Sequence, residues 1–210
     1  MFTGIVQGTG VISSIREHGS LRTLVVDFPS GFCDGVVVGA SVSIDGVCLT
    51  VTEILSKLSL SFDVMLQTLK VTTLGDYKQG RRVNVERAAK DGAEIGGHPL
   101  SGHVDCRATI ESVSVFEENK VIRFTVPSDY TRYIFAKGYI AVNGCSLTVS
   151  DADKGQSWFE VWLIPETRRM TTFEEKQAGD AVNIEIERTT QIMVDTIRDA
   201  VREALASLKG

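Results

Sequence analysis

The stretch Gly46-Val47-Cys48-Leu49-Thr50-Val51 returns 98 positions later as Gly144-Cys145-Ser146-Leu147-Thr148-Val149. Shorter matches follow in the same order, since Gly4-Ile5-Val6 corresponds to Gly102-His103-Val104. Collinear matches over this distance indicate a duplicated domain, because a solenoid unit would repeat every ~20–50 residues. Positions at which the two copies differ are therefore candidates for chemistry that one copy has and the other lacks.

The composition is that of a globular protein with room for two small domains. The chain has 210 residues, of which 43% are hydrophobic and 23% charged, so each half can bury a core. The net charge of −5, without a basic run, argues against nucleic acid or an anionic membrane as a partner. No apolar stretch approaches the ~20 residues of a membrane span, and the N-terminus lacks a signal-peptide pattern. We therefore expect a cytoplasmic protein with four reduced cysteines.

Alternation of apolar and polar residues dominates both copies and predicts strands with one buried face. In the first copy strands are predicted at residues 10–15, 21–28, 40–51, 58–64 and 82–86. In the second copy they are predicted at 104–115, 121–126, 139–149, 158–164 and 181–187. One short helix is expected at 128–136, after Pro127-Ser128. Five or six short strands per copy predict an all-β fold of two tandem antiparallel barrels.

The tail has a different pattern, which has no counterpart after the first copy. Between Thr190 and Lys209, apolar residues are spaced as one stripe of an amphipathic helix: Val194, Ile197, Val201, Leu205 and Leu208. The helix either folds back on its own domain or pairs with other copies of the chain. We favour oligomerisation, because a stripe outside two closed barrels needs a partner to cover it.

The repeated strand carries the first candidate catalytic residues. Cys48 in the first copy corresponds to Ser146 in the second, so a thiol and a hydroxyl occupy equivalent places. Taken alone, each is more often a small buried strand residue. However, Thr50 and Thr148 follow two residues later, and alternate residues of a strand share a face. A paired polar face in both copies predicts a ligand-binding wall.

Histidines supply the second group of candidates. His103 stands where the first copy has Ile5, and histidine exchanges protons near neutral pH. A packed, structural role for His103 stays open. His98, His103 and Cys106 match no zinc-ligand spacing, so we expect no metal. The copies also differ in charge at Glu166 and Gln67, whereas Glu185 and Glu187 are expected to be solvated.

Together these motifs resemble riboflavin synthase of the trimeric, alpha-type family, within the lumazine-protein superfamily. The resemblance rests on the opening Met1-Phe2-Thr3-Gly4-Ile5-Val6, on the paired Gly-x-Cys/Ser-Leu-Thr-Val strands, on residues 96–105 and on Ile164-Pro165-Glu166-Thr167. It covers the whole chain, the tail included. The motifs occur in order in both halves, which makes the resemblance highly specific.

The resemblance implies two six-stranded Greek-key barrels with a C-terminal trimerisation helix. The domains would be a lumazine-binding barrel at 1–97, a second at 98–188 and the helix at 189–210. It implies a homotrimer without cofactor or metal, in which two 6,7-dimethyl-8-ribityllumazine molecules dismutate to riboflavin and 5-amino-6-ribitylamino-uracil. Each barrel would bind one lumazine, and the working site would form between barrels of different subunits. Holding both substrates together removes much of the entropic barrier. Lumazine synthase is a further candidate partner, which the sequence leaves open.

The resemblance also assigns residues to two pockets. The pocket of the first barrel would consist of Gly4, Ile5, Val6, Ser41, Cys48, Leu49, Thr50, Asp63, Val64, Met65, Leu66, Gln67, Thr68, Gly102, His103 and Val104. The pocket of the second barrel would consist of Lys137, Ser146, Leu147, Thr148, Trp162, Leu163, Ile164, Pro165, Glu166 and Thr167.

Three of these residues are expected to be catalytic. His103 would help remove a proton from the 7-methyl group of one lumazine. Cys48 or Ser146, or a water that they hold, would add to C7 of the other. Two departures from the family pattern stand out: Gln67 replaces a common glutamate, and Pro99 follows His98.

Two rival functions remain from the sequence. Lumazine proteins share the duplicated barrel but bind a lumazine or flavin without turnover. They look degenerate at the positions that are Cys48 and His103 here, so the enzyme is favoured. A barrel pair that serves only as a protein-interaction module would show no response to small ligands.

Overall fold

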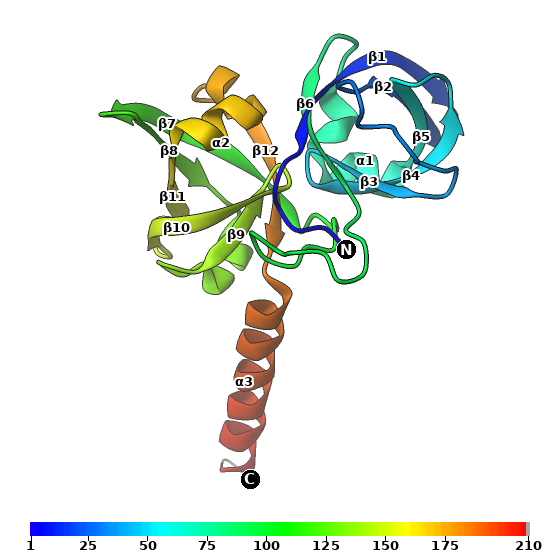
Figure 1. The fold of residues 1–210 in the computed structure, drawn as a ribbon. Coiled ribbons are helices and arrows are strands. Elements are labelled where there is room, and N and C mark those ends of the chain that lie inside the picture. The colour runs from blue at the N-terminus through cyan, green and yellow to red at the C-terminus, as the bar shows by residue number, and fades with distance from the viewer. Residues whose placement is uncertain (209–210) are drawn as a thin grey trace.

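In the computed structural model, which describes residues 1–208, two closed six-stranded antiparallel barrels are followed by one long helix (Figure 1). The first barrel contains β1 (Gly8–His18), β2 (Leu21–Asp27), β3 (Ser41–Ile44), β4 (Val47–Ile54), β5 (Ser59–Met65) and β6 (Arg82–Arg87). The second contains β7 (Cys106–Phe116), β8 (Asn119–Thr125), β9 (Tyr139–Val142), β10 (Cys145–Asp153), β11 (Trp158–Leu163) and β12 (Ala181–Ile186). The duplicated all-β fold predicted from the sequence is confirmed.

Both barrels have the same strand order, which shows that the duplication extends to topology. The first closes in the order β1-β2-β5-β4-β3-β6, and the second repeats this order with the equivalent strands. Because β2 pairs with β5 rather than with β3, the connection between β2 and β3 crosses one end of the barrel, as in a Greek key. Each barrel encloses a separate core of strand residues that point inward.

Two predicted strands are in fact hairpins. The predictions at 40–51 and 139–149 missed the turns at Asp45-Gly46 and Asn143-Gly144. Both residues of each turn have positive φ, 45° and 83° in the first and 45° and 75° in the second. Asp-Gly and Asn-Gly favour this conformation, so the signal was present in the sequence. The turns place β3 beside β4 and β9 beside β10.

Short helices account for the other differences from the prediction. Residues 128–136 were expected to be helical, and a 3-10 helix, η2, covers Ser128–Tyr133. The sequence analysis missed α1 (Leu66–Val71) with η1 (Thr73–Asp76), and α2 (Pro165–Met170) with η3 (Thr172–Glu175). Each of these pairs of short helices follows the fifth strand of its barrel. They therefore close the end of the barrel near the candidate pocket residues.

The two hairpin turns meet where the barrels touch. A Cβ atom on Gly46 would lie 2.6 Å from the backbone N of Gly144, and one on Gly144 would lie 2.8 Å from the N of Gly46. No side chain fits at either position without moving the backbone of the other barrel. The close approach therefore requires glycine in both copies.

Two asparagines join the barrels reciprocally around this contact. The Nδ2 of Asn84 donates to the carbonyl of Asn143 at 3.0 Å, and the Nδ2 of Asn183 donates to the carbonyl of Asp45 at 2.9 Å. Their Oδ1 atoms accept from backbone N–H groups of the opposite barrel, in η3 and η1. All of these groups are buried, so each hydrogen bond satisfies an atom that solvent does not reach.

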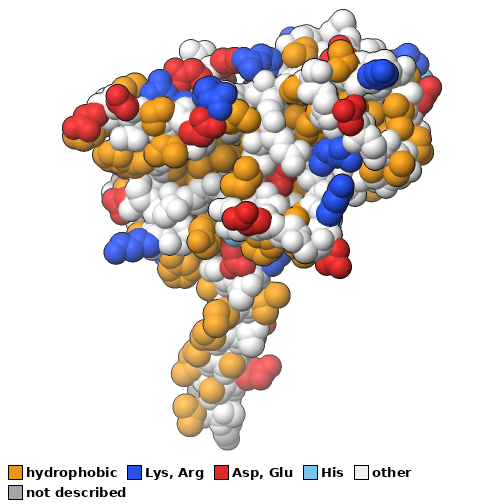
Figure 2. All heavy atoms as spheres, in the orientation of Figure 1, with side chains coloured by type: hydrophobic (Ala, Val, Ile, Leu, Met, Phe, Trp, Pro, Cys, Tyr) orange, Lys and Arg blue, Asp and Glu red, His pale blue; other side chains and the backbone are white. Residues whose placement is uncertain are grey.

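Helix α3 (Arg188–Ser207) points away from both barrels (Figure 1). It begins at Glu187, whose carboxylate accepts from the N–H groups of Thr189 and Thr190, so Glu187 is a helix cap. Within Arg188–Ser207 no residue is buried, and Ile197, at 62% exposure, is typical of its apolar stripe (Figure 2). The alternative in which the helix folds back on its own domain is therefore wrong. Oligomerisation stays a prediction, and the end of the predicted helix at Lys209 lies outside the described residues. None of the described helices is long and apolar enough to cross a membrane.

Because Gly46 and Gly144 are in close contact, adding one methyl group at Gly46 should strongly lower the free energy of unfolding. Gly46→Ala should destabilise the protein by about 1–3 kcal/mol more than Gly31→Ala, because overpacking adds to the backbone penalty. Gly31 is the matched control: it has the same φ of 83°, and no atom of the described residues would lie within 4 Å of its Cβ. Urea unfolding followed by tryptophan fluorescence measures both. Equal destabilisation would contradict the close contact.

Candidate functional site

The candidate site begins where the strand pairing stops in each barrel. Pairing between β4 and β5 runs from Ile54↔Leu60 to Val51↔Phe62, and between β10 and β11 from Asp153↔Trp158 to Val149↔Val161. Residues 48–50 and 146–148 lie beyond these pairs and are paired only with β3 and β9 on their other side. Over these residues one edge of β4 and one edge of β10 therefore have no partner in β5 or β11, and we call these two unpaired edges the slots. Backbone polar groups in these slots are available to a ligand.

A segment from elsewhere in the chain occupies one end of each slot. The N–H of Cys48 donates to the carbonyl of Gly102 at 2.8 Å, and the N–H of Ser146 donates to the carbonyl of Gly4 at 2.8 Å. Gly102 and Gly4 have positive φ, and a Cβ on either would lie within 2.6 Å of the side chain that it faces. Glycine at these positions therefore allows the segment to lie directly against the candidate nucleophile.

These contacts correct one assignment. The sequence analysis placed Gly4, Ile5 and Val6 in the pocket of the first barrel, but the structure places them at the second. Gly4 binds Ser146, and Val6 is buried in the core of the second barrel. The physical reason is that the chain crosses the second barrel before β1 begins. By contrast, the equivalent segment Gly102–Val104 lies at the first barrel, where Val104 packs against the core.

The predicted residues of the first slot lie on β3, β4, β5 and α1, and Asp63 among them accepts a hydrogen bond from Thr23 on β2 at 2.6 Å. Cys48 is half-buried and Thr50 exposed on the outer face of β4, and Ser41 lies opposite Thr50 on β3. Beneath them, the side chains of Leu49 and Val64 belong to the core. The remaining members extend from the end of β5 into α1: Asp63, Met65, Leu66, Gln67 and Thr68. Met65 is 63% exposed, so the slot has an apolar rim.

The second slot repeats this arrangement with different side chains. Ser146 is half-buried and Thr148 exposed on β10, over the buried Leu147 and Leu163. The rim is formed by the exposed residues Ile5, Trp162 and Ile164. The other predicted members, Lys137, Pro165, Glu166 and Thr167, lie in the loop before β9 and on α2. Glu166 forms an ion pair with Arg169, which lowers the pKa of its carboxyl group, whereas Gln67 at the equivalent position is neutral.

His98 is a functional candidate that the sequence analysis did not place in either pocket. Its Nδ1 lies 2.6 Å from the Oγ of Ser146, and its ring stacks on Tyr139 at 5.1 Å. The side chain is 3% exposed, and its Nε2 has no hydrogen-bond partner among residues 1–208. Burial lowers the pKa of His98, so the ring is neutral at pH 7 and able to accept a proton. Within the described chain, no hydrogen bond joins a histidine to Cys48, so the two slots differ.

The zinc alternative has no geometric basis in the described residues. His98 is directed at Ser146, whereas Cys106 lies in the core of the second barrel, where burial raises the pKa of its thiol to about 12. In residues 1–208 no group of three or more His, Cys, Asp or Glu side chains could hold a metal ion.

Two buried glutamates position the segments that enter the slots. Glu185 accepts from the N–H groups of Ser101 and Gly102 at 2.8 and 3.0 Å, and Glu86 holds Thr3 and Gly4 in the same way. The expectation that Glu185 is solvated is therefore wrong, because it is 3% exposed. The matched Val-Asn-Val-Glu and Val-Asn-Ile-Glu sequences were the available signal for this role.

His103 follows directly after Gly102 and is exposed at the first slot. Its carbonyl accepts from Arg188 at 2.8 Å, and Arg188 also forms an ion pair with Asp105 at 2.8 Å. Charged groups therefore fix the backbone of His103 from both sides, through Glu185 before it and Arg188 after it. The equivalent residue Ile5 has no such arginine, since Ala89 stands at the position equivalent to Arg188.

The buried position of His98 predicts a pH dependence of stability. Because the folded pKa is lowered, its contribution is fully present above about pH 6.5 and is lost as the pH falls through the folded pKa. His98→Asn should therefore reduce the loss of unfolding free energy between about pH 7.5 and 5. Urea unfolding at a series of pH values measures this. His18→Asn, at an exposed position, should leave the slope unchanged, and an unchanged slope in His98→Asn would contradict the prediction.

Comparison with known proteins agrees with this geometry. The model of the lumazine binding domain family matches residues 3–88 and again residues 101–187. The chain is 49% identical to riboflavin synthase of Escherichia coli (strain K12), over 94% of this chain and 92% of the relative. It is 38% identical to riboflavin synthase of Mycobacterium tuberculosis (strain ATCC 25618 / H37Rv), over 95% of this chain and 100% of the relative.

Solved structures show the same likeness in three dimensions. LumP complexed with riboflavin superposes with a TM-score of 0.82 at 26% identity, covering 89% of this chain and 100% of LumP. LumP complexed with 6,7-dimethyl-8-(1'-D-ribityl) lumazine superposes with a TM-score of 0.80 at 25% identity, covering 89% of this chain and 99% of LumP. Because two lumazine binding domains match the chain, and relatives named riboflavin synthase align with nearly all of it, the chain belongs to the riboflavin synthase family.

Proposed function

We propose that this chain converts two molecules of 6,7-dimethyl-8-ribityllumazine into riboflavin and 5-amino-6-ribitylamino-uracil. The observation that carries the proposal is the pair of equivalent slots, each bordered by its own candidate nucleophile, in a chain of this family. Two slots match a reaction that consumes two copies of one molecule. The reaction is a dismutation, in which one lumazine loses four carbons and the other gains them, so no external oxidant or cofactor is needed.

Backbone groups would bind the heterocycle in each slot. Residues 48–50 and 146–148 lie beyond the paired part of β4–β5 and β10–β11. The pyrimidinedione edge of a lumazine carries alternating donors and acceptors, so it can hydrogen-bond to a strand edge as an added strand would. The apolar rims, with Met65 at the first slot and Trp162 at the second, would cover the ring face.

We assign different roles to the two slots because their histidines differ. His103 lies at the first slot and would take the proton from the 7-methyl group of the lumazine bound there, which becomes the carbon nucleophile. Ser146 lies at the second slot with His98 at 2.6 Å, an arrangement that activates a hydroxyl or a water for addition to C7. Cys48 lacks such a base among the described residues, so we assign the added nucleophile to Ser146 rather than to Cys48.

The working site would form between subunits of a homotrimer. The slot rims expose Met65, Ile5 and Trp162, and α3 exposes a further apolar stripe (Figure 2). Association through α3 would bring the first barrel of one subunit to the second barrel of another, so that two bound lumazines face each other. Such an arrangement holds both reactants in place and lowers the entropic cost of a bimolecular step.

We also propose a cytoplasmic location with reduced thiols. The four cysteines are free in the described structure, and Cys33, Cys106 and Cys145 are buried. Burial raises the pKa of both Cys106 and Cys145 to about 12, so these thiols stay protonated. Unpaired, buried cysteines are typical of a reducing compartment.

A binding protein without turnover is the second candidate, because LumP shares the fold and its structures contain riboflavin or a lumazine. Incubation with 6,7-dimethyl-8-ribityllumazine separates the two functions. The enzyme forms riboflavin, detected by its absorption at longer wavelength, whereas a binder only changes the fluorescence of the ligand.

Turnover of single variants tests the assigned roles. His103→Ala should lower kcat by about 10²–10⁴-fold, the usual contribution of a general base. Ser146→Ala should lower kcat more than Cys48→Ala, and Ser146→Ala combined with His98→Asn should be little worse than either alone, because the pair acts as a unit. His18→Ala is the control and should be fully active, since His18 is exposed on the first barrel. A near-normal kcat in His103→Ala would refute its role.

Helix α3 provides a test of assembly. Ile197→Glu places a charge on the apolar stripe and should convert the trimer to monomers in sedimentation velocity, with a loss of turnover. Thr196→Glu places the same charge on the opposite side of the helix and should leave both unchanged. A trimer that persists in Ile197→Glu would show that α3 does not hold the subunits together.

A further inference from the structure

We propose that Arg188, the first residue of α3, is a positioning residue that fixes the direction in which His103 faces the first slot. The inference rests on the proposed function, in which His103 is the base, and it adds the residue through which that base is held. β12 ends at Ile186, and α3 begins two residues later (Figure 1). Arg188 is therefore placed by two regular elements, whereas His103 lies in the irregular stretch before β7.

The imidazole of His103 is oriented through its backbone. His103 is exposed, and within residues 1–208 its ring has no hydrogen-bond partner. Its backbone is held at both ends: the N–H donates to the Oγ of Ser101 at 3.2 Å, and the carbonyl accepts from the Nη2 of Arg188 at 2.8 Å. A general base must come within hydrogen-bond distance of the proton that it removes. The direction of the ring, and with it proton transfer, therefore depends on these two contacts.

The guanidinium of Arg188 is itself held by further contacts. Its Nη1 forms an ion pair with the Oδ1 of Asp105 at 2.8 Å and also donates to the Oε1 of Gln191. The Asp105 side chain is 10% exposed, so salt and solvent screen this ion pair less than a surface pair. The two terminal nitrogens of one planar group thus bind a carboxylate and a carbonyl, which fixes the guanidinium in one orientation.

The first copy joins the same two segments without these charges. The N–H of Ile186 donates to the Oδ2 of Asp105 at 2.7 Å, and the N–H of the equivalent Arg87 donates to the Oε1 of Gln7 at 3.0 Å. An amide in the first copy thus makes the contact that a carboxylate makes in the second. Because a neutral side chain is sufficient for this contact, the charge of Asp105 serves another purpose, which is to hold Arg188.

The added charges coincide with the histidine. Ala89 stands at the position of Arg188 in the first copy, and Ile5 stands at the position of His103. An alanine side chain has no donor for the carbonyl of Ile5, and an isoleucine side chain has no proton to exchange. The charged pair is therefore present only in the copy in which the residue to be positioned is a candidate base. This favours a role in catalysis over a role in folding alone.

Steady-state kinetics of the full-length protein test the proposal. Arg188→Met should lower kcat by about 10–100-fold with KM unchanged, because a misplacement of about 1 Å is enough to cost about 10²-fold in rate. Asp105→Asn keeps an acceptor for the N–H of Ile186 but removes the charge that holds the guanidinium, so kcat should fall by a smaller factor. Sedimentation velocity should show the wild-type assembly in both variants.

A double-mutant cycle separates positioning from a structural role. If Arg188 acts through His103, Arg188→Met should lower kcat no further in a His103→Ala background. General damage to the fold would instead lower kcat equally in both backgrounds. If Arg188→Met does not fold, Asp105→Asn replaces it in the same cycle, with the same expected result.

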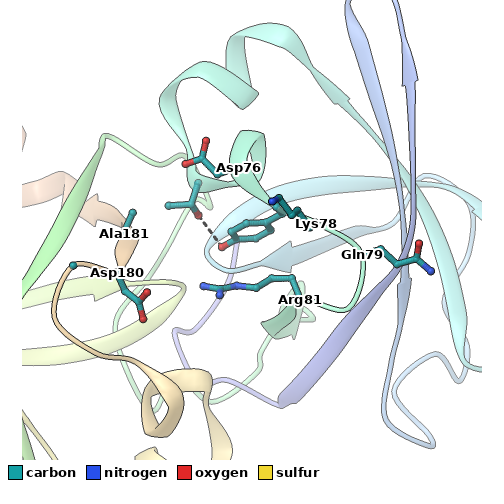
Figure 3. Close-up of a pocket in the computed structure, with 9 residues that line it drawn as sticks. Asp76, Lys78, Gln79, Arg81, Asp180 and Ala181 are labelled. Atoms are coloured by element: carbon teal, nitrogen blue, oxygen red, sulfur yellow. Dashed lines mark hydrogen bonds between the residues drawn. The ribbon is translucent and has the colours of Figure 1, made fainter.

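Two variants at exposed cations serve as controls. Arg202→Met removes an arginine from the same helix, where it pairs only with Asp199 among the described residues. Lys78→Met removes a lysine from the cleft between the barrels, whose lining residues belong to neither slot (Figure 3). Both controls should keep the wild-type kcat.

Two results would overturn the positioning role: a wild-type kcat in Arg188→Met, or an equal loss of kcat in the presence and absence of the His103 side chain. A near-normal kcat in His103→Ala would contradict the proposed base itself, and this inference with it. Failure of the inference alone is distinguishable, since His103→Ala would then be impaired while Arg188→Met would not.

Discussion

In each barrel one strand edge is partly unpaired. The segment that precedes the first strand of the other barrel forms a hydrogen bond with this edge. Gly102 meets Cys48 at the first barrel, and Gly4 meets Ser146 at the second, with one backbone hydrogen bond of 2.8 Å in each case. The buried glutamates Glu86 and Glu185 hold these segments by their N–H groups. The slots therefore owe their shape to both barrels at once. Separating the barrels would remove a wall from each slot, so the candidate site depends on the contact between them.

A symmetric backbone carries an asymmetric set of side chains. The strand order, the turns and the glycines repeat, but His103 corresponds to Ile5 and Ser146 to Cys48. The buried His98 contacts Ser146, whereas among residues 1–208 no histidine is hydrogen-bonded to Cys48. Under the proposed function, the repeated backbone would bind two identical molecules, and the differing side chains would let one lose a proton while the other gains a nucleophile. The duplication thus supplies both the likeness and the difference that a dismutation requires.

Much of the fold was predictable because it depends on local patterns. Alternating polarity located the strands, and the repeat located equivalent positions such as Cys48 and Ser146. The contact of His98 with Ser146 was not predictable, since it joins a loop to a strand 48 positions away through tertiary packing. The slots depend on where strand pairing ends, which local alternation does not determine. The position of Gly4 at the second barrel could have been inferred by symmetry. Its equivalent, Gly102, belongs to the second copy and was assigned to the pocket of the first barrel.

The contact of Gly46 with Gly144 joins equivalent positions of the two copies. After the duplication, a side chain acquired by either half would have collided with the backbone of the other. Neither half could change here independently, so evolutionary drift at this point was constrained in both at once. This accounts for the glycine that begins both hexapeptides.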